Sequence, residues 1–374
     1  MDFSFTETQE ALAALAAQIF SGQASVERVK EVERSDERVD RVLWAELAKA
    51  NLLGLSLPEA DGGSGLGMTE VCLVLEAQGR RVALVPLVWA LTAALTIAEF
   101  APEAQRRAWL PGFINGELLL SAGLAEEGAG DTLRPVLEAV PEGDGWRLDG
   151  PKVSVPAAHV SARVLVAARV VSSDDLVVVL VDPRAHGVTA EHAEATNHEL
   201  VTHLSFDGVV VGAADVVAGP PDGARATRFA LERALVGLAA IQVGVAEEAI
   251  AQAAAYTSQR VQFARPLSSF QSTAAKAADA YIDTEAMRAT LWQAAWRLDA
   301  GLDASMEVEV ATWWASEAGQ RVVHTTQHLH GGMGADVEYP IHRYFLWGKQ
   351  IEGTLGGASA HLARIGRALA EASA

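Results

Sequence analysis

Three short stretches in the last third of the 374-residue chain carry the side chains best suited to bind or transform a ligand. The first contains Arg260, Phe263 and Arg265, with Gln271 shortly after. Guanidinium groups pair with phosphates, and an exposed aromatic ring can stack on a flat ligand. The structural alternative is that both arginines complement the end of a helix and that Phe263 belongs to the core. Composition alone favours this alternative.

The second stretch is the glycine-rich sequence His-Gly-Gly-Met-Gly at residues 330–334. Glycines let the backbone approach a ligand closely, so the N–H groups of Gly331 and Gly332 can surround an anion. The structural alternative is a helix end followed by a turn.

The third stretch is Glu352-Gly353-Thr354, which we expect to form a loop before a helix. A carboxylate between glycines at such a place can meet a ligand. The alternative is an ordinary interaction of the carboxylate with the dipole of the following helix.

The histidines and the single cysteine indicate neither a metal site nor redox chemistry. His324 and His328 share a helix face, but a metal site would need a third ligand that the sequence does not offer. We interpret His328 and His330 as solvated or cofactor-adjacent. The single cysteine, Cys72, lies in an apolar run and is expected to be a buried structural thiol.

The elements that must position these stretches fall into three regions, which predict an α+β fold. Residues 1–117 form an N-terminal all-α domain, residues 118–218 a middle antiparallel, β-barrel-like domain, and residues 219–374 a C-terminal four-helix bundle. The predicted N-terminal helices include one over residues 6–20, one capped by Asp36, and one that begins at Met68. The predicted strands cover residues 146–150, 162–171, 176–181 and 204–211. The predicted C-terminal helices cover residues 226–256, 270–298, 306–328 and 355–372.

The acidic composition limits the partners of the chain. A net charge of −19 and a pI near 4.9 exclude nucleic acid and anionic membrane surfaces. A phosphate-bearing cofactor must then be held by a local arginine or by backbone N–H groups. The N-terminus lacks the charged region of a signal peptide, and no apolar run of 18 residues is free of charge, so we expect a cytoplasmic protein without a membrane span.

Taken together, these motifs resemble the acyl-CoA dehydrogenase family over the whole chain. The resemblance is most specific in Arg260-x-x-Phe263-x-Arg265-Pro266 with Phe270-Gln271, in residues 330–334 and in Glu352-Gly353-Thr354. It also includes the N-terminal Asp2-Phe3-Ser4-Phe5-Thr6 and the glycine-rich loop after Leu57-Pro58-Glu59.

The resemblance implies an FAD enzyme of lipid degradation by β-oxidation. It would oxidise an acyl-CoA to the trans-2-enoyl-CoA and pass electrons to an electron-transfer flavoprotein. In the family, FAD binds between the β domain and the bundle and reaches across a dimer interface within a tetramer. By resemblance, Arg260, Phe263, Gln271, Gly331 and Gly332 would bind the pyrophosphate and adenine of a neighbouring subunit's FAD, and Thr354 would also bind the cofactor.

The resemblance also assigns the catalytic base. Glu352 stands at the commonest base position of the family. Some members carry the base early in the long helix, where Ala234 stands in this chain and Glu232 lies nearby. We therefore expect Glu352 to be the base and keep Glu232 as the alternative.

The departures from the family pattern are concentrated in the β domain. The family's Thr-Glu-Pro-Gly-Ala-Gly-Ser-Asp is replaced by residues 125–131, and its flavin-contacting Trp-Ile-Thr by residues 153–156. Leu235 replaces a frequent arginine, and His328 stands where a glutamine is common. The residues that would bind a neighbouring subunit's FAD match the family pattern. Those that would surround this chain's own flavin ring are largely replaced.

This pattern leaves open three alternatives. The chain can be a self-sufficient homo-oligomeric dehydrogenase. Alternatively, it can be a non-catalytic or half-site partner subunit of a hetero-oligomer with a second acyl-CoA dehydrogenase subunit, like those acting on steroid side-chain thioesters. A flavin oxidase on the same fold is the less favoured third.

Overall fold

The structure is a computed structural model that describes residues 4–127 and 131–372. Asp2, Phe3 and the segment Gly128–Gly130, which belong to motifs discussed above, lie outside the described residues. The chain forms two units that interleave along the sequence. The first contains the described residues up to Val29, Met68–Ala83 and those from Leu235 onward; the second contains Lys30–Gly67 and Leu84–Ala234. The predicted boundaries at residues 117 and 218 stay predictions.

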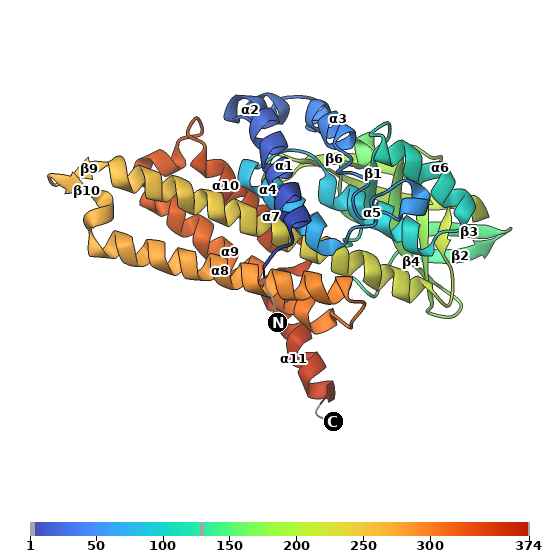
Figure 1. The fold of residues 1–374 in the computed structure, drawn as a ribbon. Coiled ribbons are helices and arrows are strands. Elements are labelled where there is room, and N and C mark those ends of the chain that lie inside the picture. The colour runs from blue at the N-terminus through green and yellow to red at the C-terminus, as the bar shows by residue number, and fades with distance from the viewer. Residues whose placement is uncertain (1–3, 128–130, 373–374) are drawn as a thin grey trace. The chain divides into compact units, whose positions relative to one another are not determined.

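The first unit is made of helices (Figure 1). They are α1 (Glu7–Gln23), α4 (Met68–Arg81), most of α7 (Gly223–Gln259), α8 (Gln271–Asp299), α9 (Ser305–Leu329), α10 (Ile341–Gly353) and α11 (Gly357–Ala372). Helix α9 packs against α8, α10 and α11, which makes it central to the unit. The short strands β9 (Val261–Gln262) and β10 (Arg265–Pro266) form a hairpin between α7 and α8.

Helix α7 follows from a long run without proline that is rich in helix-forming residues. It crosses α4 with backbones in contact: a Cβ on Gly79 would lie 2.1 Å from the Ile241 carbonyl oxygen, and one on Gly244 would lie 2.0 Å from that of Glu76. Only glycine allows this approach. Part of α7 is apolar and long enough to cross a membrane, but 78% of that window is buried, as in the core helix of a globular protein.

The second unit combines helices with a mixed sheet. Its helices are α3 (Arg41–Lys49), α5 (Leu87–Phe100) and α6 (Glu103–Ile114); α2 (Val26–Glu33) lies where the two units meet in the sequence. Its strands are β1 (Leu120–Gly123), β2 (Glu138–Glu142), β3 (Gly145–Pro156), β4 (Arg163–Val170), β5 (Leu176–Val181), β6 (Val188–Glu194), β7 (Leu200–Val211) and β8 (Val216–Ala218).

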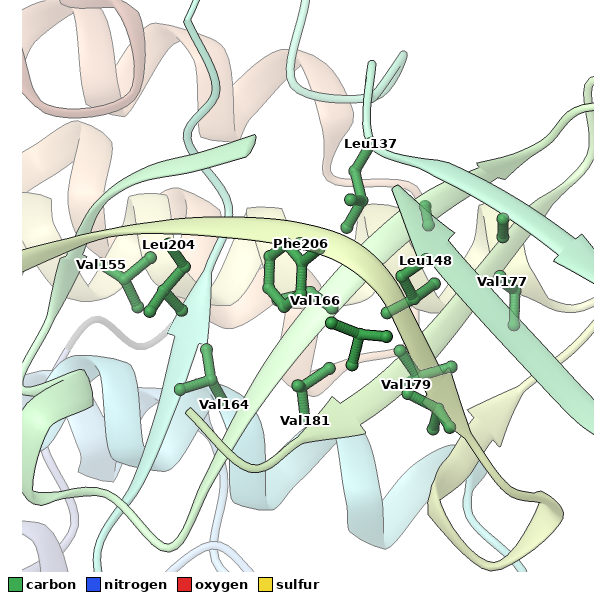
Figure 2. Packing of buried hydrophobic residues seen from close by; sticks show 14 of the residues in the cluster. Leu137, Leu148, Val155, Val164, Val166, Val177, Val179, Val181, Leu204 and Phe206 are labelled. Atoms are coloured by element: carbon green, nitrogen blue, oxygen red, sulfur yellow. The ribbon is translucent and has the colours of Figure 1, made fainter. Parts of the chain in front are cut away.

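The sheet has the order β6-β7-β3-β2-β4-β5-β8, and β1 adds to β4. Most neighbours are antiparallel, as predicted, but β4 pairs in parallel with both β1 and β2. Figure 2 shows the apolar core that the strands enclose, with Val164 and Val166 of β4 beside Val179 and Val181 of β5. The uninterrupted apolar run of β5 is buried throughout, as expected for a strand covered on both faces.

The predicted α+β class, with N-terminal helices, a middle sheet and C-terminal helices, is confirmed. One local prediction is wrong, and one helix was not predicted. The side chain of Asp40, not that of Asp36, caps α3, where it accepts hydrogen bonds from the N–H groups of Val42 and Leu43. Helix α10 is an element that the sequence patterns did not predict. Cys72 is buried, and burial raises the pKa of its thiol well above the usual value, which agrees with a structural role.

Candidate functional site

The Arg260 stretch forms a tight hairpin at the end of α7. The Arg260 N–H donates to the Tyr256 carbonyl oxygen at 2.9 Å, and the Arg260 carbonyl oxygen accepts from the Leu267 N–H at 2.9 Å. Between them, Gln262 pairs with Arg265 across a two-residue turn. The turn residues Phe263 and Ala264 have φ of 52° and 62°, the positive values that a type I′ turn requires.

The side chains of this hairpin are presented to solvent. Phe263 is 88% exposed, so its assignment to the core, the structural alternative above, is wrong. Within the described part of the chain, the exposed Arg260 side chain makes no ion pair. The Arg265 guanidinium lies over the Phe270 ring, 3.9 Å from its centroid. Gln271 is the exposed first residue of α8.

The glycines that follow α9 expose their backbone. Gly331 has a φ of +59°, and Gly331 and Gly332 are both exposed. A Cβ on either would meet no heavy atom within 4 Å, so their backbone is open to a ligand. Gly334 has a different role: a Cβ there would lie 2.4 Å from the Gln327 carbonyl oxygen, and the Gln327 amide donates to the Gly334 carbonyl oxygen at 2.8 Å.

One ring contact brings these two stretches together. The imidazole of His330, next to Gly331, stacks on Tyr256, which is one turn before Arg260, with 4.7 Å between ring centroids. His330 is 1% exposed, so its interpretation as a solvated residue is wrong, whereas His328 is exposed. His330 Nδ1 lies 2.7 Å from the Thr326 carbonyl oxygen, which places a proton on Nδ1. Burial lowers the pKa of His330.

Glu352 lies in the last turn of α10, not in a loop before a helix as predicted. Its side chain is 29% exposed and pairs with the Lys349 ammonium. The Thr354 hydroxyl donates to the Gln350 carbonyl oxygen at 2.7 Å, which continues the helix end. The three residues that follow, Leu355, Gly356 and Gly357, have φ of 60°, 131° and 70° and form an irregular turn into α11.

The alternative base, Glu232, lies on the part of α7 that belongs to the second unit and is half-buried there. Ala234, at the position where some family members carry their base, is fully buried. Each unit thus carries one candidate carboxylate.

A buried ion pair in the second unit was missed by sequence reasoning. Lys152 of β3 and Glu126 are 1% and 2% exposed, and their charged atoms are 2.5 Å apart. Glu126 also accepts hydrogen bonds from the N–H groups of Val136 and Leu137. The pair ties β3 to both ends of the segment that contains Gly128–Gly130. Burial lowers the pKa of Lys152, although Glu126 opposes the shift. The residues are 26 apart in sequence, so no local signal joins them.

Within the described residues, no group of three or more His, Cys, Asp or Glu side chains could hold a metal ion. The first unit therefore offers a surface suited to an anion and a flat ring, made of the hairpin and the open glycines. Separately, it offers a half-buried carboxylate on α10.

The comparisons with known proteins identify the family of the chain. Models of the acyl-CoA dehydrogenase N-terminal and C-terminal domains match residues 6–117 and 222–370. The chain is 38% identical to acyl-CoA dehydrogenase FadE27 of Mycobacterium tuberculosis, with 100% of both chains covered.

Two solved structures are also similar over nearly their full length. One is the Tcur3481-Tcur3483 steroid ACAD G363A variant, with 47% identity, a TM-score of 0.93 and coverage of 98% of this chain and 99% of the other. The second is the ChsE4-ChsE5 complex from Mycobacterium tuberculosis, with 37% identity, a TM-score of 0.93 and 99% of both chains covered. The chain therefore belongs to the acyl-CoA dehydrogenase family, whose members are generally FAD-dependent oxidoreductases acting on acyl-CoA.

Proposed function

We propose that this chain is a subunit of an FAD-dependent acyl-CoA dehydrogenase that converts an acyl-CoA to its trans-2-enoyl-CoA. The observation that carries the proposal is the stacked pair Tyr256–His330, which joins the exposed hairpin to the exposed glycines in one surface. Family membership supplies the reaction class, and this surface supplies the cofactor contact.

The surface fits the ADP half of FAD. The Arg260 guanidinium is exposed and can pair with a pyrophosphate, and the Phe263 ring, 88% exposed, can stack on adenine. The backbone at Gly331 and Gly332 is open and can donate N–H groups to phosphate oxygens. This solves the problem of binding an anionic cofactor on a chain of net charge −19. Gln271 and Thr354 complete the proposed cofactor contacts.

The proposed chemistry of the chain's own residues is a proton transfer. Glu352 removes a proton from the α-carbon of the acyl group, and the hydride from the β-carbon is accepted by FAD when it is bound. The Glu352 carboxylate lies beside the Lys349 ammonium, and an ionised carboxylate is the form that accepts a proton. The electrons then pass to an electron-transfer flavoprotein, and the protein acts in the cytoplasm.

A second candidate is a partner subunit that offers the ADP half-site without catalysing the reaction itself. Two observations favour it. Ser154, in the region where the family carries its flavin-contacting Trp-Ile-Thr, has no aromatic ring and lies at an irregular point of β3 with a φ of 50°. Moreover, the two similar solved structures are by name two-component assemblies, one of them a steroid ACAD. In that case the assembly is a hetero-oligomer and the substrate is a bulky steroid thioester.

The test is to purify the chain alone and measure bound FAD per chain by its visible spectrum. One FAD per chain, bleached anaerobically by an acyl-CoA, would support the first candidate. A colourless chain that gains FAD and activity only when co-expressed with a second acyl-CoA dehydrogenase subunit would support the second.

The base is tested in whichever preparation is active. Glu352→Gln should lower the rate of flavin reduction by about 10²–10⁴-fold, the usual contribution of a general base, while FAD stays bound. Glu232→Gln is the matched control and should leave the rate within about twofold of the wild-type protein. If instead Glu232→Gln lowers the rate and Glu352→Gln does not, the base is Glu232 of α7.

A further inference from the structure

Helix α11 is fastened to α9 by a polar cluster. Among the described residues of α11, only His361 is fully buried, whereas the apolar side chains of Leu362 and Leu369 are 54% and 57% exposed. A helix normally docks through an apolar stripe, so a single buried imidazole is an unusual anchor. The cluster consists of Glu309 on α9 with His361 and Arg364 on α11.

The geometry of the cluster is tight. His361 Nδ1 lies 2.7 Å from Glu309 Oε2 and 3.0 Å from Arg364 Nη2, so the imidazole contacts both charged groups of the cluster. Arg364 Nε lies 3.0 Å from Glu309 Oε1 and 3.1 Å from Oε2. The three side chains are 0%, 18% and 14% exposed for His361, Glu309 and Arg364, so solvent screens these contacts little.

The far end of Arg364 reaches the turn that follows Glu352. Its Nη2 lies 3.5 Å from the Leu355 carbonyl oxygen. A Cβ on Gly356 would lie 3.2 Å from the same Nη2, so the guanidinium packs directly on this glycine. A Cβ on Gly357 would lie 3.2 Å from the Glu352 carbonyl oxygen, so the turn folds back on Glu352 itself.

The turn needs such support. Leu355, Gly356 and Gly357 all have positive φ, and Leu355 is not a glycine, so this backbone is strained and persists only where its surroundings hold it. Thr354, at the start of the turn, has its hydroxyl bonded to the last turn of α10. The orientation of Glu352 at the helix end therefore depends on how the turn is held.

We infer that Arg364, oriented by Glu309 and His361, is a positioning residue that holds the turn at residues 354–357 and thereby sets the place of the Glu352 carboxylate. The inference rests on the proposed function only where it concerns turnover. The part that concerns the turn is a property of this chain alone.

The experiment compares Arg364→Met with Arg367→Met, in the chain alone or in the assembly that proves active. Arg367 lies on the same helix, is exposed and matches the change in charge and size. Hydrogen exchange of a peptide over residues 350–360 should quicken about tenfold in Arg364→Met and stay unchanged in Arg367→Met. A peptide from the buried middle of α9 should stay protected in both.

Turnover supplies the second readout. Arg364→Met should lower kcat about tenfold while KM for the acyl-CoA stays within about twofold, and Arg364→Lys should restore part of kcat. If Arg364→Met does not fold, Glu309→Gln serves instead, because it keeps the shape of the cluster and weakens its charge.

The possible outcomes distinguish a failure of the positioning role of Arg364 from a failure of the proposed role of Glu352 as the base. Wild-type exchange over residues 350–360 in Arg364→Met would overturn the positioning role whatever the activity. Faster exchange with kcat unchanged would overturn the link to Glu352. Full activity in Glu352→Gln would overturn the proposed base while leaving the exchange result valid.

Discussion

The imidazole of His330 lies nearly parallel to the phenol ring of Tyr256, at an interplanar angle of 26° and a centroid distance of 4.7 Å. Tyr339 approaches both rings, at 5.5 Å from His330 and 6.4 Å from Tyr256. These three rings connect the end of α7, the end of α9 and the segment before α10. The separation between Arg260 and the open glycines is thus fixed by aromatic packing.

Loss of this packing should weaken FAD binding. Aromatic pairs contribute about 0.5–1.5 kcal/mol, so Tyr256→Ala should raise the Kd for FAD about 2- to 10-fold in the FAD-binding preparation, measured by quenching of flavin fluorescence. Tyr256→Phe keeps the ring and should bind as the wild-type protein does. Equal affinities for all three proteins would contradict a role for the stack.

Arg260 should contribute more, because it acts on the charged part of the cofactor. Hydrogen bonds to charged groups contribute about 1.5–3 kcal/mol, so Arg260→Ala should raise the Kd for FAD about 10- to 100-fold. Lys276→Ala is the control, since this exposed residue of α8 lies outside the proposed surface and carries the same charge. A loss of affinity that is equal in both variants would indicate a general effect of charge.

A single methyl group added where α4 and α7 cross should lower the stability of the protein. Gly244→Ala would place a Cβ 2.0 Å from the Glu76 carbonyl oxygen, and overpacking of this kind costs about 1–3 kcal/mol or more. Gly22→Ala, in α1 with no atom within 4 Å of the new Cβ, should instead stabilise the protein by about 0.5–1 kcal/mol. Thermal or urea unfolding measures both, and a stable Gly244→Ala protein would show that the helices can separate.

His159 should make the stability of the protein depend on pH. Burial lowers its pKa most, the nearby His192 and Arg41 lower it further, and contact with the Glu37 carbonyl oxygen opposes the shift. Below about pH 6.5, the unfolded chain binds a proton that the folded protein binds less readily. Stability is therefore complete above this pH and is lost as pH falls toward the folded pKa, by at most about 1.4 kcal/mol per pH unit.

The matching measurement is urea unfolding between pH 7 and pH 5. His159→Gln keeps a donor for the Glu37 carbonyl oxygen and should flatten the pH dependence, whereas His186→Gln, at an exposed position, should not. An unchanged slope in His159→Gln would exclude this residue as a source of the pH dependence. Burial also lowers the pKa of His330, so some dependence should persist.

The elements that could be predicted are those whose signal lies in a short, continuous stretch of sequence. Helix α7 was predicted from its long proline-free run and strand β5 from its apolar run, because both signals act over neighbouring residues. Helix α10 was missed because it begins after Pro340 and ends in a glycine-rich turn, so its pattern is short and interrupted.

The candidate site was predictable as motifs but not as a geometry. The exposure of Phe263 and the burial of His330 depend on contacts between elements that no local pattern shows. The same holds for the Lys152–Glu126 pair, since its two residues meet only when β3 packs against the preceding segment.

The turn at Phe263 and Ala264 has a thermodynamic consequence. A two-residue turn closed by the pairing of Gln262 and Arg265 has few accessible backbone conformations, so the aromatic ring is displayed on a nearly rigid support. A ligand that stacks on the Phe263 ring then restricts mainly the two side-chain torsions of Phe263. Association at this point should therefore lose little conformational entropy.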